Sequence, residues 1–182
     1  MNLFTVFDLT VVFVTSLSVF FDLKERRIPN WLILVGLVAA LCLSGFRGFT
    51  EFYLSILGFI VGIAVFIVPF ALGWMGAGDV KYFAVVGALL GVGRLPRVVF
   101  YSVLAAGVMA VGHVALGRFR AGFFSEGWND FKLAILSFGR VLPDSITVRT
   151  AKGADSVPWG VAIGVGTIVV YYFDPSGRWA GF

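Results

Sequence analysis

Residues 60–68 read IVGIAVFIV, a run of apolar side chains around one glycine. A strand of a membrane β-barrel alternates apolar and polar residues with a period of two, and this run does not alternate. It lies within a longer apolar stretch, Phe52–Trp74, and about 20 apolar residues suffice for a helix to cross the hydrocarbon layer. The stretch therefore predicts a membrane-spanning helix.

Five other apolar stretches lie before and after this one. The full set is Leu3–Phe21, Trp31–Phe46, Phe52–Trp74, Val80–Val92, Val98–Leu116 and Val157–Phe173. The second, fourth and sixth stretches are shorter than a typical span, so we expect them to thin the bilayer or to lie behind neighbouring helices. The sequence predicts an all-α, polytopic membrane protein with about six transmembrane helices, arranged as one domain over residues 1–182.

The composition fits a protein embedded in a lipid bilayer. Hydrophobic residues make up 59% of the chain and charged residues 13%, whereas charged residues make up about 25% of a typical soluble domain. The net charge is +4, but no basic run is longer than Lys24–Arg27, so we expect no nucleic-acid partner. The single cysteine, Cys42, excludes a disulfide framework within the chain and a four-cysteine zinc site.

The distribution of basic residues predicts the orientation of the helices. If the N-terminus lies outside, the inner side carries ten of the 14 Lys and Arg residues and the outer side carries four. Cytoplasmic loops carry an excess of such residues, so we expect both termini outside. The interval 118–156 then forms a cytoplasmic loop. Its apolar residues from Trp128 to Leu142 recur every three or four positions, which predicts an amphipathic helix on the inner surface or a cover for the ends of neighbouring helices.

Ionisable side chains are costly to keep near a membrane span, and those present are therefore informative. Four lie within apolar stretches or at their ends: Asp8, Asp22, Asp79 and His113. Asp8 precedes Asp22 by 14 residues, or about 21 Å along a helix, so we expect it near the outer surface in an interfacial or paired role. A lone histidine on a glycine-rich helix is typical of a hydrogen-bonded packing residue.

Asp22 ends the first apolar stretch on the inner side. Basic residues follow it, and then the segment Ile28-Pro29-Asn30, in which the proline ends the helix and Asn30 is placed to cap the next one. The simplest structural role for Asp22 is an ion pair with a basic neighbour at the level of the lipid headgroups.

Asp79 lies in the segment Gly76-Ala77-Gly78-Asp79-Val80-Lys81 between two apolar stretches. The glycines allow close approach of another chain segment, and Asp79 is placed to cap a helix that begins at Val80. Taken alone, this pattern indicates a helix cap in a tight turn. However, the second and third helices form a hairpin that returns the chain to the inner side, so Asp22 and Asp79 can meet there. Two carboxylates that share a proton are the working groups of aspartic peptidases.

Three segments resemble a known family. The segment Gly76–Lys81 resembles the Gly-x-Gly-Asp-x-Lys motif of the type IV prepilin peptidases. Asp22 with Ile28-Pro29-Asn30 is similar to the first aspartate segment of that family, and Val157-Pro158-Trp159-Gly160 is similar to the start of its last helix.

The resemblance implies a specific function and site. It implies that Asp22 and Asp79 are catalytic, that Gly76, Gly78 and Lys81 belong to an active-site loop, and that no cofactor is used. The implied reaction is removal of the basic leader from prepilin-like substrates at the cytoplasmic face of a bacterial inner membrane. The long members carry a methyltransferase portion with two Cys-x-x-Cys pairs, which this chain lacks. It therefore resembles the short form associated with Flp or Tad pili, and N-methylation is not expected.

Two other readings of the same residues stay open at this point. In the first, the chain is a small transporter or channel subunit whose Asp22 and Asp79 are proton or cation sites. A transport pathway would need polar groups near the middle of the membrane, where these stretches look apolar. In the second, the chain is an assembly scaffold whose aspartates only pair with lysines. No metal site is expected, because no cluster has zinc-ligand spacing.

Overall fold

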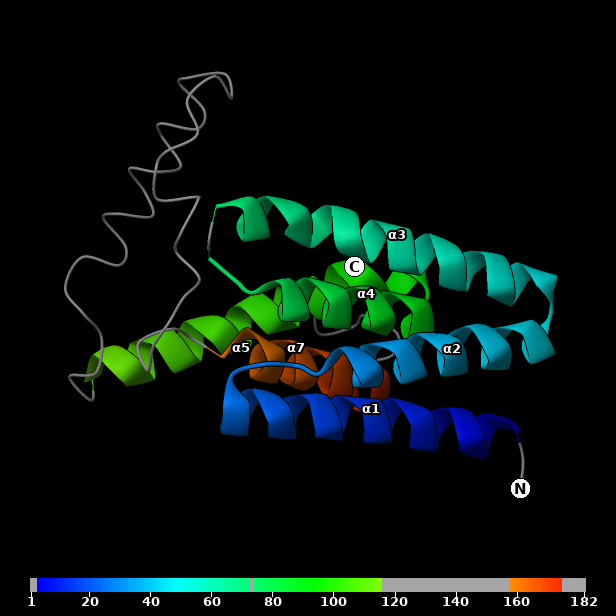
Figure 1. Ribbon diagram of the computed structural model, residues 1–182, viewed down its shortest axis with the longest axis horizontal. Coiled ribbons are helices and arrows are strands. Elements are labelled where there is room, and N and C mark those ends of the chain that lie inside the picture. Colours follow the sequence, from blue (N-terminus) through cyan, green and yellow to red (C-terminus); the bar gives the residue numbers. More distant parts are fainter. Residues whose placement is uncertain (1–2, 73, 116–157, 175–182) are drawn as a thin grey trace, which may run out of the picture.

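The computed structural model describes residues 3–72, 74–115 and 158–174, and this part of the chain is helical (Figure 1). Its α-helices are α1 (Leu3–Glu25), α2 (Asn30–Arg47), α3 (Phe49–Ala71), α4 (Ala77–Leu90), α5 (Leu95–Ala115) and α7 (Trp159–Ile168). A short 3₁₀ turn, Val92–Arg94, leads into α5, and a π-helical segment, Val169–Phe173, continues α7. Each α-helix coincides with one of the six predicted apolar stretches. The predicted segment 118–156 lies outside the described residues.

Four helices are long and apolar enough to cross a membrane: α1, α2, α3 and α5. The prediction of an all-α, polytopic membrane protein is therefore confirmed. The helix α4 has 14 residues, which is fewer than the roughly 20 needed for a full span. It instead packs behind its neighbours, because it contacts α1, α2, α3 and α7 and every residue from Tyr82 to Leu90 is buried.

The contact between α3 and α4 depends on small residues at the crossing point. A Cβ atom at Gly58 would lie 2.1 Å from the Gly87 carbonyl oxygen, and one at Gly87 would lie 2.2 Å from the Gly58 oxygen. Ser55 adds a hydrogen bond across the same interface, because its hydroxyl donates to the Ala88 carbonyl at 2.7 Å. Such close approach of backbones is the usual way in which helices associate in lipid, and it fixes the position of α4.

Polar contacts hold the far end of α7 against α1 and α5. The Tyr101 hydroxyl donates to the Asp174 carboxylate at 2.8 Å, and Arg97 Nη1 donates to the Asp174 carbonyl at 3.3 Å. The Tyr171 hydroxyl donates to the Asp8 carboxylate. The paired role predicted for Asp8 is therefore confirmed, at the end of α1 remote from Asp22.

Candidate active site

Two aspartates from distant parts of the sequence meet at the beginning of α7. Asp22 lies in the last turn of α1 and is 5% exposed, and its carboxylate accepts the Val161 N–H at 3.0 Å. Asp79 lies in the first turn of α4 and is half-buried. The Gly160 N–H interacts with both carboxylates by hydrogen bonding, and Asp22 lies close enough for its charge to affect Asp79. Figure 1 shows the end of α1 and the beginnings of α4 and α7 at the same end of the bundle.

The position of Asp22 is explained by an unfilled cap at the beginning of α7. The first N–H groups of a helix have no partner within the helix, and an N-cap side chain usually accepts one of them. Here the N-cap residue is Pro158, which makes no side-chain cap hydrogen bond. Asp22 accepts the Val161 N–H in its place. The positive end of the helix dipole favours a negative charge at this point, so α7 provides a binding position for an ionised Asp22.

Gly160 permits this approach. A Cβ atom at position 160 would lie 2.8 Å from Cγ and Oδ2 of Asp22 and 2.9 Å from its Cβ, so a side chain there would force Asp22 to move. Sequence reasoning did not identify the roles of Gly160 and the Val161 N–H. The sequence shows only that Pro158 and Gly160 lie where a helix begins. That pattern does not indicate that the helix start contacts Asp22, which is 139 residues before Val161.

Asp79 caps its own helix, although not in the predicted manner. The sequence predicted a helix that begins at Val80 with Asp79 at the cap position. The helix α4 instead begins at Ala77, and the Asp79 carboxylate accepts the Gly76 N–H at 3.0 Å from within the first turn. This geometry corresponds to the acidic half of a capping box. The shift places the carboxylate beside the start of α4, where Asp22 also lies.

Burial raises the pKa of Asp79 to about 7, and the charge of Asp22 acts in the same direction. The N–H groups of Gly76 and Gly160 oppose these effects by stabilising the charged form. Asp79 lies outside the four helices that are long enough to cross the membrane. The carboxyl group of Asp79 therefore keeps its proton at a higher pH than an ordinary aspartate does, beside a second carboxylate that can share it.

The raised pKa predicts that the stability of the protein falls as the pH rises. A carboxyl with a pKa of about 7 when folded and about 3.9 when unfolded stabilises the folded state fully below about pH 4. That contribution is lost as the pH rises towards the folded pKa. We expect the unfolding temperature in detergent to fall between pH 5 and pH 8, and to fall less in Asp79→Asn, whose side chain does not titrate. If the unfolding temperature of both proteins fell equally with pH, the raised pKa of Asp79 would be contradicted.

The prediction that Gly76, Gly78 and Lys81 belong to a loop is wrong for the last two. Because α4 begins at Ala77, Gly76 is the N-cap, and Gly78 and Lys81 lie within the helix beside Asp79. Gly78 packs against Ile28 of the turn between α1 and α2, because a Cβ at position 78 would meet Ile28 atoms at 3.6 to 3.8 Å. Lys81 Nζ donates to Asn30 Oδ1 at 3.1 Å. The predicted cap by Asn30 is therefore wrong. The helix α2 begins at Asn30 itself after Pro29, so the side chain is free to bind Lys81 and joins α2 to α4.

A tryptophan links the beginning of α7 to the segment before α4. Trp159 Nε1 donates to the Trp74 carbonyl at 2.9 Å, and the Trp159 ring packs edge-on against Phe66 of α3 with 6.3 Å between ring centroids. These contacts fix the N-terminus of α7, and with it the N–H groups that hold Asp22. The charge of Arg26 also acts on Asp22. Asp22 therefore interacts with a basic neighbour, as predicted, and also lies beside Asp79.

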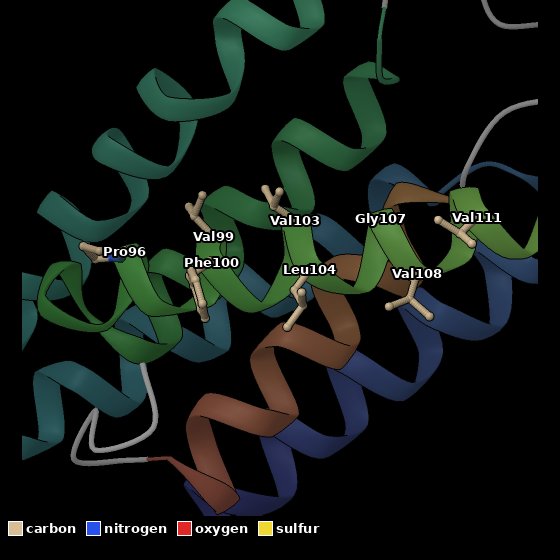
Figure 2. A pocket seen from close by; sticks show the side chains of 8 residues that line it. All are labelled: Pro96, Val99, Phe100, Val103, Leu104, Gly107, Val108 and Val111. Carbon is tan, nitrogen blue, oxygen red and sulfur yellow. The ribbon is translucent and has the colours of Figure 1, made fainter. Parts of the chain in front are cut away.

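An open groove on α5 lies apart from these residues (Figure 2). Its lining is entirely apolar and runs from Pro96 to Val111, as expected for a surface that faces lipid chains. His113 lies in α5 by its backbone, and its side chain is outside the described part of the chain. Among the described residues, no group of three or more His, Cys, Asp and Glu side chains could hold a metal ion.

Comparison with known proteins gives one family. The model of the type IV leader peptidase family matches residues 9–111, which is more than half of the chain and includes Asp22 and Asp79. No curated protein and no solved structure matches the chain.

Proposed function

Because the chain belongs to the type IV leader peptidase family, we propose that it is an aspartic endopeptidase that uses Asp22 and Asp79 as its catalytic pair. The family makes the chain a membrane peptidase in general terms. The observation that carries the finer proposal is the placement of both carboxylates beside the Gly160 N–H at the beginning of α7.

The geometry supports a different role for each aspartate. Asp22, held by the Val161 N–H, is the ionised base that takes a proton from water as the water oxygen bonds to the substrate carbonyl carbon. Asp79, with its pKa of about 7, donates its proton to the carbonyl oxygen. When the tetrahedral intermediate collapses, the C–N bond breaks, the proton on Asp22 passes to the leaving nitrogen, and Asp79 recovers its own proton from the intermediate hydroxyl. The two groups return to their starting states.

The proposed substrate is a prepilin-like protein of the Flp or Tad type, cut on the cytoplasmic side before its hydrophobic helix. The resemblance of Gly76–Lys81 to the family motif supports the substrate class. The basic residues that follow Asp22 in the sequence support the cytoplasmic placement. In this proposal Asp79 is positioned by Gly76 at the N-cap of α4 and by Gly78 and Lys81 within the first turns of that helix.

Cleavage of a prepilin by membranes that contain the protein tests the proposal. We expect loss of the leader, detected by mass spectrometry of the pilin, when membranes with the wild-type chain are incubated with a Flp-type prepilin. Membranes prepared without the chain serve as the control. An intact leader after incubation with correctly inserted protein would contradict the proposed activity.

The orientation is tested by cysteine labelling from outside the cell in a Cys42→Ser background. A probe at Glu51, which is exposed in the first turn of α3, should react with a membrane-impermeant reagent. A probe at Glu25, which is exposed at the end of α1 near Asp22, should not. Reaction at Glu25 together with protection at Glu51 would place the aspartates on the outer side.

A further inference from the structure

Two short backbone segments each hold one of the two aspartates. The Val161 N–H, in the first turn of α7, donates to the Asp22 carboxylate at 3.0 Å. The Gly76 N–H, immediately before α4, donates to the Asp79 carboxylate at 3.0 Å. The distance between the two carboxylates therefore depends on how the beginning of α7 is held relative to the segment before α4.

The Trp159 side chain joins these two segments directly. Its indole Nε1 donates to the Trp74 carbonyl at 2.9 Å, although the two residues are 85 positions apart in the sequence. Trp159 is the first residue of α7 and precedes Val161 by two positions. Trp74 precedes Gly76 by two positions. Each end of this hydrogen bond is therefore two residues from an N–H that holds an aspartate.

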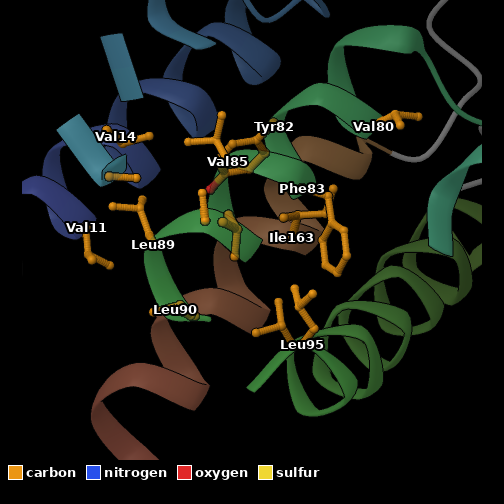
Figure 3. Close-up of a cluster of buried hydrophobic side chains, with 14 of the residues drawn as sticks. Val11, Val14, Val80, Tyr82, Phe83, Val85, Leu89, Leu90, Leu95 and Ile163 are labelled. Carbon is orange, nitrogen blue, oxygen red and sulfur yellow. The ribbon is translucent and has the colours of Figure 1, made fainter. Parts of the chain in front are cut away.

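Aromatic packing holds the indole in the orientation that the hydrogen bond requires. The Trp159 ring packs edge-on against Phe66 of α3, with 6.3 Å between ring centroids. Phe66 in turn packs edge-on against Phe83 of α4, with 4.2 Å between ring centroids. Both phenylalanines belong to the buried hydrophobic cluster, of which Figure 3 shows Phe83, and Trp159 packs against this cluster. Aromatic pairs prefer such edge-to-face arrangements, so the indole N–H stays directed towards the Trp74 carbonyl.

The backbone on the acceptor side is held as well. The Trp74 N–H donates to the Pro69 carbonyl in the last turn of α3 at 3.0 Å. Met75, the next residue, is 6% exposed, and Gly76 is the N-cap residue of α4. Residues 74–76 are therefore attached to α3 at one end and to α4 at the other, and Trp159 attaches the beginning of α7 to them.

We propose that Trp159 is a positioning residue that sets the separation of Asp22 and Asp79 by joining the beginning of α7 to the segment before α4. This role rests on the proposed function, because it affects cleavage only if the two aspartates act as a pair. In that mechanism Asp22 takes a proton from water while Asp79 donates one to the carbonyl oxygen, so both carboxyl groups must reach the same substrate group together. The indole itself does not act on the reacting atoms.

Trp159→Phe tests the role in cleavage, because it removes the indole N–H and keeps an aromatic ring against Phe66. With a Flp-type prepilin we expect kcat to fall about tenfold and KM to stay unchanged, since misplacement of a reacting group by about 1 Å can cost about a hundredfold. Trp31→Phe is the matched control. The Trp31 ring also packs edge-on against a phenylalanine, Phe21, but lies at the beginning of α2 and is 52% exposed. That variant should change neither constant, and an unchanged kcat in Trp159→Phe would overturn the proposal.

The pH dependence of stability gives a test that does not require cleavage. Burial raises the pKa of Asp79 to about 7, and the charge of Asp22 on α1 adds to this effect. The N–H groups of Gly76 and Gly160 oppose it, and the contribution of Gly160 is the smallest of the four. Lys81, the basic residue nearest to Asp79 in the sequence of α4, donates to Asn30 of α2. The raised pKa therefore reports how closely the site is closed around Asp79.

Without the indole N–H, the beginning of α7 is free to move away from the segment before α4. Water then reaches the Asp79 carboxyl, and Asp22, which is bound to the Val161 N–H, is drawn away from it, so the pKa of Asp79 falls towards its ordinary value. A raised pKa stabilises the folded state at low pH, and this stability is lost as the pH rises towards that pKa. We therefore expect the unfolding temperature to fall less between pH 5 and pH 8 in Trp159→Phe than in the wild type.

The possible results separate the role of Trp159 from a purely structural one. A purely structural role would lower the unfolding temperature of Trp159→Phe equally at every pH, and this result would overturn the proposal. If Trp159→Phe does not insert, 3-benzothienylalanine at position 159 keeps the shape of the indole and replaces its N–H by sulfur, and it should give the same changes in kcat and in pH dependence. Wild-type cleavage by Asp22→Asn would instead overturn the proposed catalytic pair, and the pH dependence of Trp159→Phe would still report whether Trp159 holds the two segments together.

Discussion

Asp79→Asn is expected to lose leader cleavage by a factor of about 1,000 or more, and Asp22→Asn should lose as much. Asparagine keeps the shape of the side chain but cannot carry or exchange the proton that the mechanism moves. Groups that act as one unit fail together, so the removal of either costs nearly as much as the removal of both. The measurement is the initial rate of leader loss from a prepilin by membranes that contain equal amounts of inserted protein.

Glu25→Gln is the matched control for this experiment. It removes one carboxylate from the same end of α1, but Glu25 is exposed where Asp22 is buried. The expected rate is close to that of the wild type. The pH dependence adds a second criterion, because a pair that shares a proton gives a bell-shaped profile whose limbs belong to the pair and not to one residue. Wild-type cleavage by Asp79→Asn would remove the basis for a catalytic pair and favour the transporter reading.

The helices and the meeting of the aspartates could be predicted from the sequence for physical reasons. A membrane helix must be apolar over most of its length. Apolar runs such as residues 60–68 therefore indicate where the helices lie in the sequence. The meeting of Asp22 and Asp79 followed from counting crossings, since a hairpin of two helices returns the chain to the same side. Neither inference required knowledge of how the helices pack.

The packing partners could not be predicted in the same way. Asparagine is a common helix-capping residue, yet α2 begins at Asn30 itself, and the Asn30 side chain binds Lys81 of α4. Which helix face meets which neighbour depends on all the helices at once, and a single sequence does not record it. For that reason the contact of Asp22 with the beginning of α7 appears only in three dimensions.

Gly160→Ala is expected to reduce cleavage by about a hundredfold with little change in KM. The added methyl group would lie 2.8 Å from Cγ of Asp22 and equally close to its Oδ2, so the carboxylate must move away from the beginning of α7. This movement stretches the 3.0 Å hydrogen bond from the Val161 N–H and changes the position of Asp22 relative to Asp79. A displacement of about 1 Å in a reacting group can cost about a hundredfold in rate.

The matched control is Gly107→Ala, which makes the same chemical change in α5. A Cβ at position 107 meets no described atom within 4 Å, and alanine has a higher helix propensity than glycine. This variant should therefore insert normally and cleave at the wild-type rate. If Gly160→Ala, present at the same level, also cleaves at that rate, Asp22 does not depend on the beginning of α7 for its position. The mechanism would then have to locate the ionised aspartate elsewhere, because the helix N-terminus that favours its charge would no longer be its partner.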